Sequence, residues 1–175
     1  MGHEETYPRD LYTHAELQRE LVRLADAVAA RLRAQGVGSR TLTLKVRFHG
    51  FHTISRSVTV SGPVDTAHAI VRAVTPLLAA VDPSPGVRLL GVSGSNLGPV
   101  AHQLSMEELM ADAPASNEEW STAERTMDEI RSRFGTRAIG PASSVSGQGL
   151  RPVRRGAQQW GPDEQPRHPP PPPSS

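Results

Sequence analysis

The stretch RTLTLKVRFHGFHTISRSVTVSG, Arg40–Gly62, alternates apolar and polar residues on both sides of Gly50. A period of two is typical of a β-strand with one buried face, and a glycine between two such runs marks a tight turn. We predict a hairpin with strands at about 40–48 and 52–60. Its buried side would carry Leu42, Leu44, Val46, Phe48, Ile54, Val58 and Val60. Arg56 falls on that same side, which predicts a bulge or an edge position.

Helical patterns flank the hairpin. Leucines and valines recur at helical spacing after Thr13, which with Glu16 forms a capping box, and Gly36 ends this helix. A second helix follows Asp65 or Thr66, and Pro76 predicts a kink or an early stop near residue 74.

Two further strands complete the predicted sheet. Residues 3–7 form a short one, which Pro8 ends or confines to a sheet edge. Residues 87–97 form the last. The order β-α-β-β-α-β predicts an α+β fold, with a four-stranded, largely antiparallel sheet and two helices on one face.

The character of the chain changes after residue 97. We divide its 175 residues into a folded domain at 3–97, a linker at 98–116, a helix at 117–135 and a disordered tail rich in Pro, Gly, Ser and Arg at 136–175. In the helix, Trp120, Met127, Ile130 and Phe134 would form an apolar stripe, and Asn117 is a candidate cap.

The uncovered sheet face is the candidate site. Hydroxyl groups and cations are groups that hydrogen-bond phosphate without reading bases, although an ordinary solvated sheet is the alternative interpretation. The face would carry Thr41, Thr43, Lys45, Arg47, Thr53, Ser55, Ser57, Ser93 and Ser95, with Arg40, Arg56 and Arg88 at its margins.

Other kinds of site find little support in the sequence. The net charge is only +1, so anion binding must come from local clustering, and the absence of cysteine excludes thiolate metal sites and disulfides. The seven histidines lack ligand spacing, and no catalytic constellation is evident. We predict no cofactor, no metal and no membrane partner. The lack of an apolar span or a signal sequence favours a cytoplasmic location.

Together these segments resemble the little finger domain of Y-family DNA polymerases, of the bacterial DNA polymerase IV type. The resemblance rests on EETY (4–7), RTLTLKVRF (40–48), TISRSVTV (53–60) and GVRLLGVSGSNL (86–97), in the family's order and spacing, and covers about residues 3–97. The later stretches MDEIRSRFG, AIGPAS and RPVRRGAQQWGP are similar to the segment after this domain in actinobacterial members.

The resemblance implies a sheet that docks on the backbone of duplex DNA beside a polymerase site and helps in tolerating damaged templates. It assigns phosphate contacts to Ser55, Arg56, Arg88 and Ser93, and the alternation adds Thr43 and Lys45. The metal-binding carboxylates of such enzymes belong to palm, fingers and thumb regions that would precede this chain. We therefore expect a DNA-binding module that is not an enzyme on its own.

A second hypothesis concerns the sequence QLSM at residues 103–106. It is similar to the sliding-clamp motif of these polymerases, with Met106 in place of leucine and Glu107 in place of phenylalanine. On this hypothesis Gln103, Leu104 and Met106 bind the clamp, and the protein regulates polymerase exchange. A third alternative is that the chain is a truncated part of a DNA-directed DNA polymerase.

Overall fold

The computed structural model describes residues 1–100, 117–136 and 138–142, and the pairs 145–146 and 149–150. Four strands form one antiparallel sheet: β1 (Gly2–Leu11), β2 (Val37–Phe48), β3 (Thr53–Val64) and β4 (Val87–Pro99). Their spatial order is β1-β4-β2-β3, so β1 and β3 are the edges. The predicted α+β fold and element order are confirmed.

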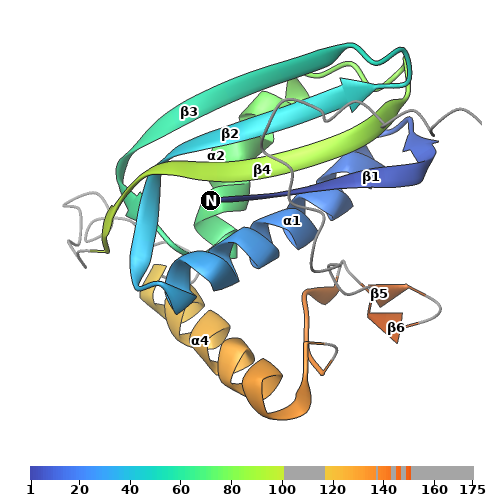
Figure 1. Ribbon diagram of the computed structural model, residues 1–175. Helices are drawn as coiled ribbons and strands as arrows, with labels where there is room; N and C mark the ends of the chain where they lie inside the picture. Colours follow the sequence, from blue (N-terminus) through green and yellow to red (C-terminus); the bar gives the residue numbers. More distant parts are fainter. Residues whose placement is uncertain (101–116, 137, 143–144, 147–148, 151–175) are drawn as a thin grey trace, which may run out of the picture.

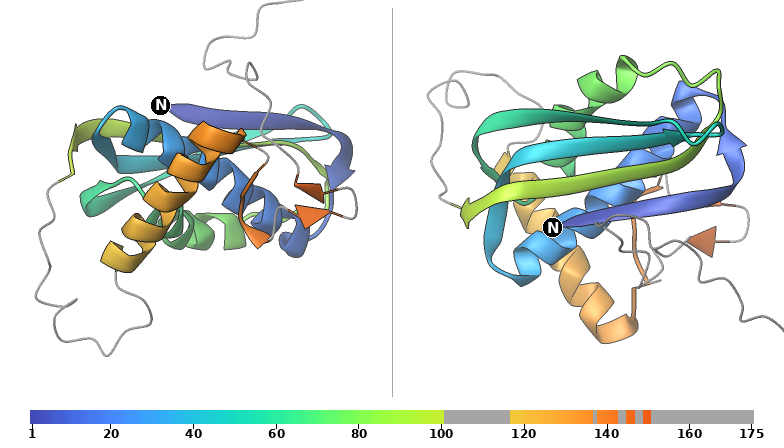
Figure 2. Two further views of the ribbon diagram at one scale, coloured as in Figure 1. Left: turned by 90° about the horizontal axis from the view of Figure 1, so that it is seen from below. Right: turned by 45° about the horizontal axis from the view of Figure 1, so that its top comes forward.

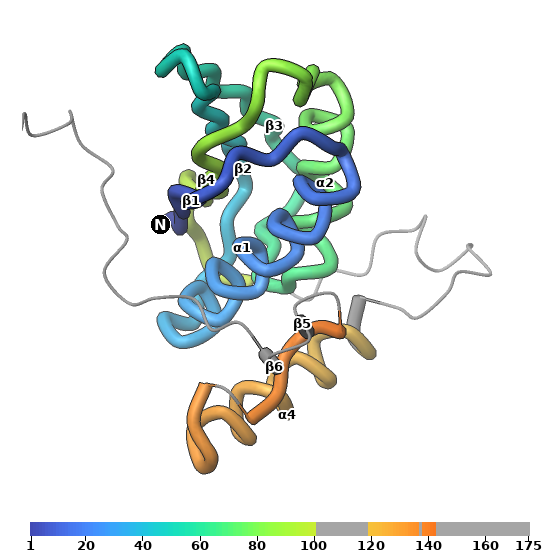
Figure 3. The backbone as a smooth tube through the Cα atoms, turned by 90° about the vertical axis from the view of Figure 1, so that its right-hand side faces the viewer, coloured from blue at the N-terminus to red at the C-terminus, as the bar shows by residue number. Residues whose placement is uncertain are grey.

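Helices α1 (His14–Ala34) and α2 (Ala67–Ala79) both pack on the same face of the sheet (Figure 1). The opposite face of the sheet carries neither helix, as an edge-on view shows (Figure 3). Leu42, Leu44 and Val46 of β2 are at most 1% exposed and lie beneath the helices. The core is therefore a single layer of mostly aliphatic side chains, with Tyr7, between the sheet and the two helices.

Local signals define most element boundaries. Thr13 and Glu16 form the predicted capping box of α1, and the chain leaves the helix through Gly36 at φ 65°. Thr66 caps α2. The early stop expected at Pro76 is wrong, because α2 continues through it to Ala79.

The edge strands explain two of the sequence expectations. β1 extends past Pro8 to Leu11 with a register shift after Thr6, and a proline is tolerated there because an edge strand has one unpaired side. Arg56 lies on the other edge strand, β3, paired with Leu44 in regular register. The predicted edge position of Arg56 is confirmed, and the alternative of a bulge at that residue is wrong.

His3 is a buried polar residue of β1, fully covered on the helix-bearing side. Burial and the charges of Arg31 and Arg23 lower the pKa of His3 to about 4. The imidazole is therefore neutral at pH 7, and Arg31 Nη2 lies 3.4 Å from its Nδ1.

Helix α4 (Asn117–Phe134) crosses beneath α1 and contacts the start of α2, in front of them in the view from below (Figure 2). Of the predicted apolar stripe, Met127 and Ile130 are half-buried, whereas Phe134 is 76% exposed and Trp120 39%. The buried residues of α4 are instead Ser121 and Glu124. Trp120 contributes a ring contact, stacking on His68 with centroids 4.7 Å apart.

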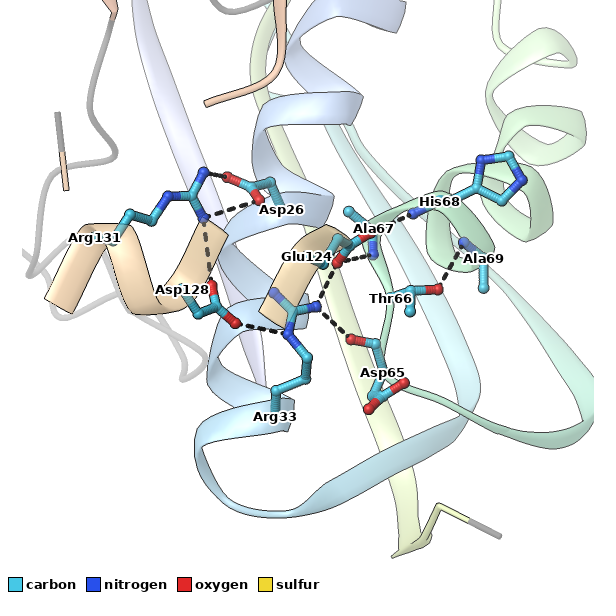
Figure 4. A network of polar contacts seen from close by, with 10 residues as sticks. All are labelled: Asp26, Arg33, Asp65, Thr66, Ala67, His68, Ala69, Glu124, Asp128 and Arg131. Atoms are coloured by element: carbon cyan, nitrogen blue, oxygen red, sulfur yellow. Dashed lines mark hydrogen bonds and ion pairs between the residues drawn. The ribbon is translucent and has the colours of Figure 1, made fainter. Parts of the chain in front are cut away.

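Charged groups dock α4 (Figure 4). The Arg33 guanidinium forms an ion pair with Glu124, donates from Nε to Asp128 Oδ2 at 2.7 Å, and donates from Nη1 to the Asp65 carbonyl at 2.8 Å. Arg131 binds both carboxylate oxygens of Asp26, at 2.8 and 3.1 Å. The docking surface is thus a chain of ion pairs that includes buried members.

Glu124 also caps a second helix. Its carboxylate accepts hydrogen bonds from the backbone N–H groups of Ala67 and His68, at 2.9 and 3.3 Å, in the first turn of α2. Burial raises the pKa of the Glu124 carboxyl, and these donors together with Arg33 oppose that shift. A residue more than 50 positions away in the sequence thereby accepts hydrogen bonds from the otherwise unpaired N–H groups at the start of α2.

The described part of the predicted tail at 136–175 includes a short piece of regular structure. Strands β5 (Val145–Ser146) and β6 (Gly149–Leu150) pair antiparallel. Most of the linker predicted at 98–116 lies outside the described residues, as do residues 151–175.

Replacing Arg33 with methionine should lower the free energy of unfolding by about 3 kcal/mol, because it leaves buried Glu124 without its cation. Urea unfolding at pH 7 measures this. Arg19→Met, on the exposed side of the same helix, is the matched control and should change stability by less than about 0.5 kcal/mol. Equal effects of the two substitutions would show that the α4 contact is not stabilising.

Candidate nucleic-acid interface

Hydroxyl groups meet across β2 and β3 on the open face. Thr41 and Thr59 place their Oγ1 atoms 3.2 Å apart, and the hydroxyls of Thr43 and Ser57 are 2.8 Å apart. These residues are direct cross-strand partners, so their side chains share one face of the sheet. The result is a row of paired hydroxyls that can reorient to donate or accept.

The row continues toward the hairpin turn with two cations. Lys45 pairs with Ser55, and Arg47 pairs with Thr53, whose hydroxyl accepts a hydrogen bond from Arg47 Nε at 3.1 Å. Ser55 is exposed, and Arg47 is half-buried. The predicted residues of these two strands therefore lie together on the open face, apart from the margin residues Arg40 and Arg56.

Strand β4 adds the serines on the other side of β2. Ser93 is the cross-strand partner of Thr43, and Ser95 is the partner of Thr41. Ser95 is exposed and Ser93 is half-buried, beside Gly2 of β1. The open face thus carries Thr41, Thr43, Lys45, Arg47, Thr53, Ser55, Ser57, Thr59, Ser93 and Ser95 over three adjacent strands.

An acidic residue also lies on this face. Glu4 of β1 accepts a hydrogen bond from Lys45 Nζ at 3.0 Å, and both side chains are largely buried. Between them in the sheet is Gly91, the cross-strand partner of each. A Cβ at Gly91 would lie 2.8 Å from Glu4 Cβ, so the absence of a side chain there lets Glu4 and Lys45 meet over β4.

The three arginines predicted at the margins of the open face lie in different parts of the structure. Because Arg56 pairs with Leu44, its side chain is directed to the helix-bearing side, where it is exposed at the sheet edge. Arg40 is the residue before Thr41, so the alternation of the strand directs it away from the open face. Its Nη2 donates to the Ser61 carbonyl at 3.1 Å. The structure separates Arg40 and Arg56 from the open-face row.

Arg88 lies at the hairpin end of the sheet in a separate cluster. Its Nε is 3.3 Å from Asp10 Oδ1, and His49 Nδ1 is 2.6 Å from Asp10 Oδ2. Burial acts to raise the pKa of Asp10, but the hydrogen bonds from His49 and Arg88 outweigh it and hold this pKa below its ordinary value. Asp10 therefore stays ionised and fixes the guanidinium of Arg88.

Sequence reasoning missed Glu4 and Asp10 as the anionic partners of Lys45 and Arg88. EETY signalled a strand, but nothing local indicated that Glu4 would lie beside Lys45, 41 positions away. Gln103, Leu104 and Met106 lie outside the described residues. Within the described part of the chain, no cluster of three or more acidic or histidine residues could hold a metal ion, and no helix could span a membrane.

Comparison with known proteins identifies the domain. Residues 1–106 match the impB/mucB/samB family C-terminal domain. The chain belongs to this family. The resemblance to the little finger domain of Y-family polymerases, inferred from the hairpin and the last strand, is confirmed.

Relatives with this domain are longer proteins. The chain is 40% identical over 116 residues to DNA polymerase IV of Streptomyces coelicolor, covering 66% of this chain and 23% of that protein. It is 34% identical over 151 residues to DNA polymerase IV of Moorella thermoacetica, covering 86% and 36%. The chain thus spans about a quarter to a third of the length of these relatives.

A solved structure described as a complex of the beta-clamp processivity factor and the little finger domain of PolIV is also similar. Its TM-score is 0.48 at 20% sequence identity, covering 60% of this chain and 96% of that chain.

Gly91→Ala should lower the free energy of unfolding by about 1–3 kcal/mol, because the added methyl group forces β1 away from β4 at Glu4. Urea unfolding measures the change. Gly98→Ala in the same strand is the matched control, because a Cβ there meets nothing within 4 Å. If both variants were equally stable, the close approach of Glu4 to Gly91 would make no contribution to the free energy of unfolding.

Proposed function

We propose that this domain binds the sugar-phosphate backbone of duplex DNA through its open sheet face, as a non-catalytic part of damage-tolerant DNA synthesis and repair. The observation that carries the proposal is the continuous row of hydroxyls and cations over β2, β3 and β4, on a face that neither α1 nor α2 covers. Phosphate oxygens are the natural partners of such groups.

The chemistry of the row favours backbone contact over base readout. The Thr and Ser side chains are short, and Lys45 and Arg47 already donate hydrogen bonds within the face, to Glu4 and Thr53. Groups that contact phosphate fix position without carrying sequence information. In this proposal Thr43, Lys45, Arg47, Ser55, Ser93 and Ser95 form the main contact, Arg88 extends it at the hairpin end, and Arg40 and Arg56 act only from the sheet edge.

Membership of the family supports the functional context. The relatives are DNA polymerases, and the chain matches a limited part of their length. We infer that polymerase chemistry belongs to regions of those proteins outside this match. The domain would hold duplex DNA for such a catalytic region.

Sliding-clamp binding through Gln103, Leu104 and Met106 stays a separate prediction from the sequence. Deleting residues 102–106 and measuring affinity for a sliding clamp tests it without altering the sheet face. Loss of clamp binding with unchanged DNA binding would support two independent surfaces.

A duplex-DNA titration at several salt concentrations tests the main proposal. With about 4 to 5 phosphate contacts, log K should fall with log salt at a slope of about −4, and Kd should lie in the non-specific range of about 10⁻⁴ to 10⁻⁶ M. Arg47→Ala should weaken binding to all duplex sequences alike. Arg72→Ala, which removes an exposed arginine of α2 on the other side of the sheet, should leave duplex binding unchanged. Discrimination between sequences, or equal effects of the two substitutions, would contradict backbone contact by the open face.

Glu4→Gln should strengthen duplex binding about three- to tenfold at low salt, because it removes a negative charge from the face and releases Lys45 from its ion pair with Glu4. Fluorescence anisotropy with labelled duplex measures this. The control is Glu129→Gln, which makes the same charge change at an exposed residue of α4 and should have little effect on duplex binding. An equal gain in both variants would mean that only net charge matters.

A further inference from the structure

The turn between β2 and β3 holds an aromatic residue in an unfavourable backbone conformation. Phe51 has φ 62°, in the left-handed region that favours glycine, while the glycine of this turn is its neighbour Gly50. The conformation is fixed by hydrogen bonds from Phe51 N to Phe48 O and from Phe48 N to His52 O, both 2.9 Å. A residue with a side chain pays an energetic penalty there, because its Cβ approaches the following carbonyl oxygen.

Burial does not compensate this penalty, because the side chain of Phe51 is 71% exposed. A large apolar ring that is both strained and exposed contributes little to folding. Strain of this kind is characteristic of functional sites, which points to a binding role for the ring.

The ring lies beside a cation, in a cluster of charged and polar groups that includes Arg88, Asp10 and His49. The Arg88 guanidinium lies over the Phe51 ring, with Cζ 5.6 Å from the ring centroid, and its Nε donates to Asp10 Oδ1 at 3.3 Å. His49 and His52, close to Phe51 in the chain, are also exposed; His49 hydrogen-bonds to Asp10, and His52 stacks on Phe48. A protein partner that docks by apolar contact needs a broad apolar patch, whereas a single ring beside an arginine suits a flat, anionic ligand.

The turn is continuous with the proposed DNA-binding face. The open-face row ends at the Arg47–Thr53 pair, and the turn begins one residue beyond Arg47 and its partner. His49 N donates to Gly86 O at 2.8 Å, which holds the turn against the start of β4 (Figure 2). A nucleic-acid strand that follows the row would therefore reach Phe51 at its end.

We propose that Phe51 stacks on an unpaired nucleobase where a DNA strand leaves the duplex held on the open face. The neighbouring Arg88 would pair with the phosphate of that nucleotide. This inference rests on the proposed function and adds to it a preference for junctions between double-stranded and single-stranded DNA. Stacking accepts any base, because every base has a π-face.

The experiment compares three labelled probes by anisotropy with the full chain: a blunt duplex, the same duplex with a short single-stranded overhang, and that overhang with abasic sites. The wild-type protein should prefer the base-bearing overhang by about tenfold. Phe51→Ala should lose this preference and still bind the blunt duplex normally. Phe51→Trp should keep it, because an indole also stacks.

Phe51→Gly separates stacking from stability. Glycine relieves the positive φ, so this variant should be at least as stable as the wild type and should still lose the preference for the overhang. Unchanged preference in Phe51→Gly, or an equal preference for the abasic overhang, would overturn the stacking proposal alone. Failure of the wild-type protein to bind the blunt duplex at low salt would overturn the proposed function, and the stacking proposal with it.

Discussion

Burial of Leu42, Leu44 and Val46 beneath α1 and α2 determines the arrangement of everything else in this domain. Because side chains alternate along a strand, burying these three directs Thr43, Lys45 and Arg47 to the opposite face. A slip of one residue in β2 would place a lysine and an arginine in an aliphatic core. The composition of the open face is therefore a consequence of the packing on the other side.

Helix α4 is attached by a different physical principle. Its contacts with α1 and α2 are ion pairs, a bidentate Arg131–Asp26 contact and a cap on the start of α2, with one stacked ring pair. Buried ion pairs add little net stability over apolar packing, but they penalise any arrangement that leaves one charge unpaired. They specify where α4 sits more than they strengthen its attachment.

The sequence was most informative where the signals are local. The alternation in Arg40–Gly62 and the Thr13–Glu16 capping box predicted the hairpin and α1 because both depend on residues close in the chain. The same local rules wrongly allowed an early stop of α2 at Pro76, and they did not indicate that Ser121 and Glu124 would be the buried residues of α4.

The candidate site was predicted in part for the same reason. Alternation placed the hydroxyls of β2, β3 and β4 on one face with Lys45 and Arg47, but it could not show that β1 would bring Glu4 beside Lys45, since that contact depends on sheet order. Arg88 belongs to the Asp10 cluster because the register shifts between Arg47 and Phe48, which no local pattern indicates.

The contact of Glu4 with Lys45 has a consequence for how such a surface can work. A lysine that already pairs with an anion of the same protein must give up that ion pair to bind an external anion. The free energy needed to break the first pair therefore reduces the net free energy of binding. Such a surface holds its ligand briefly when it acts alone. Covalent attachment to a second domain that binds the same ligand raises the local concentration of that ligand and compensates for the weak affinity. The domain is therefore suited to acting as one of several linked binding sites.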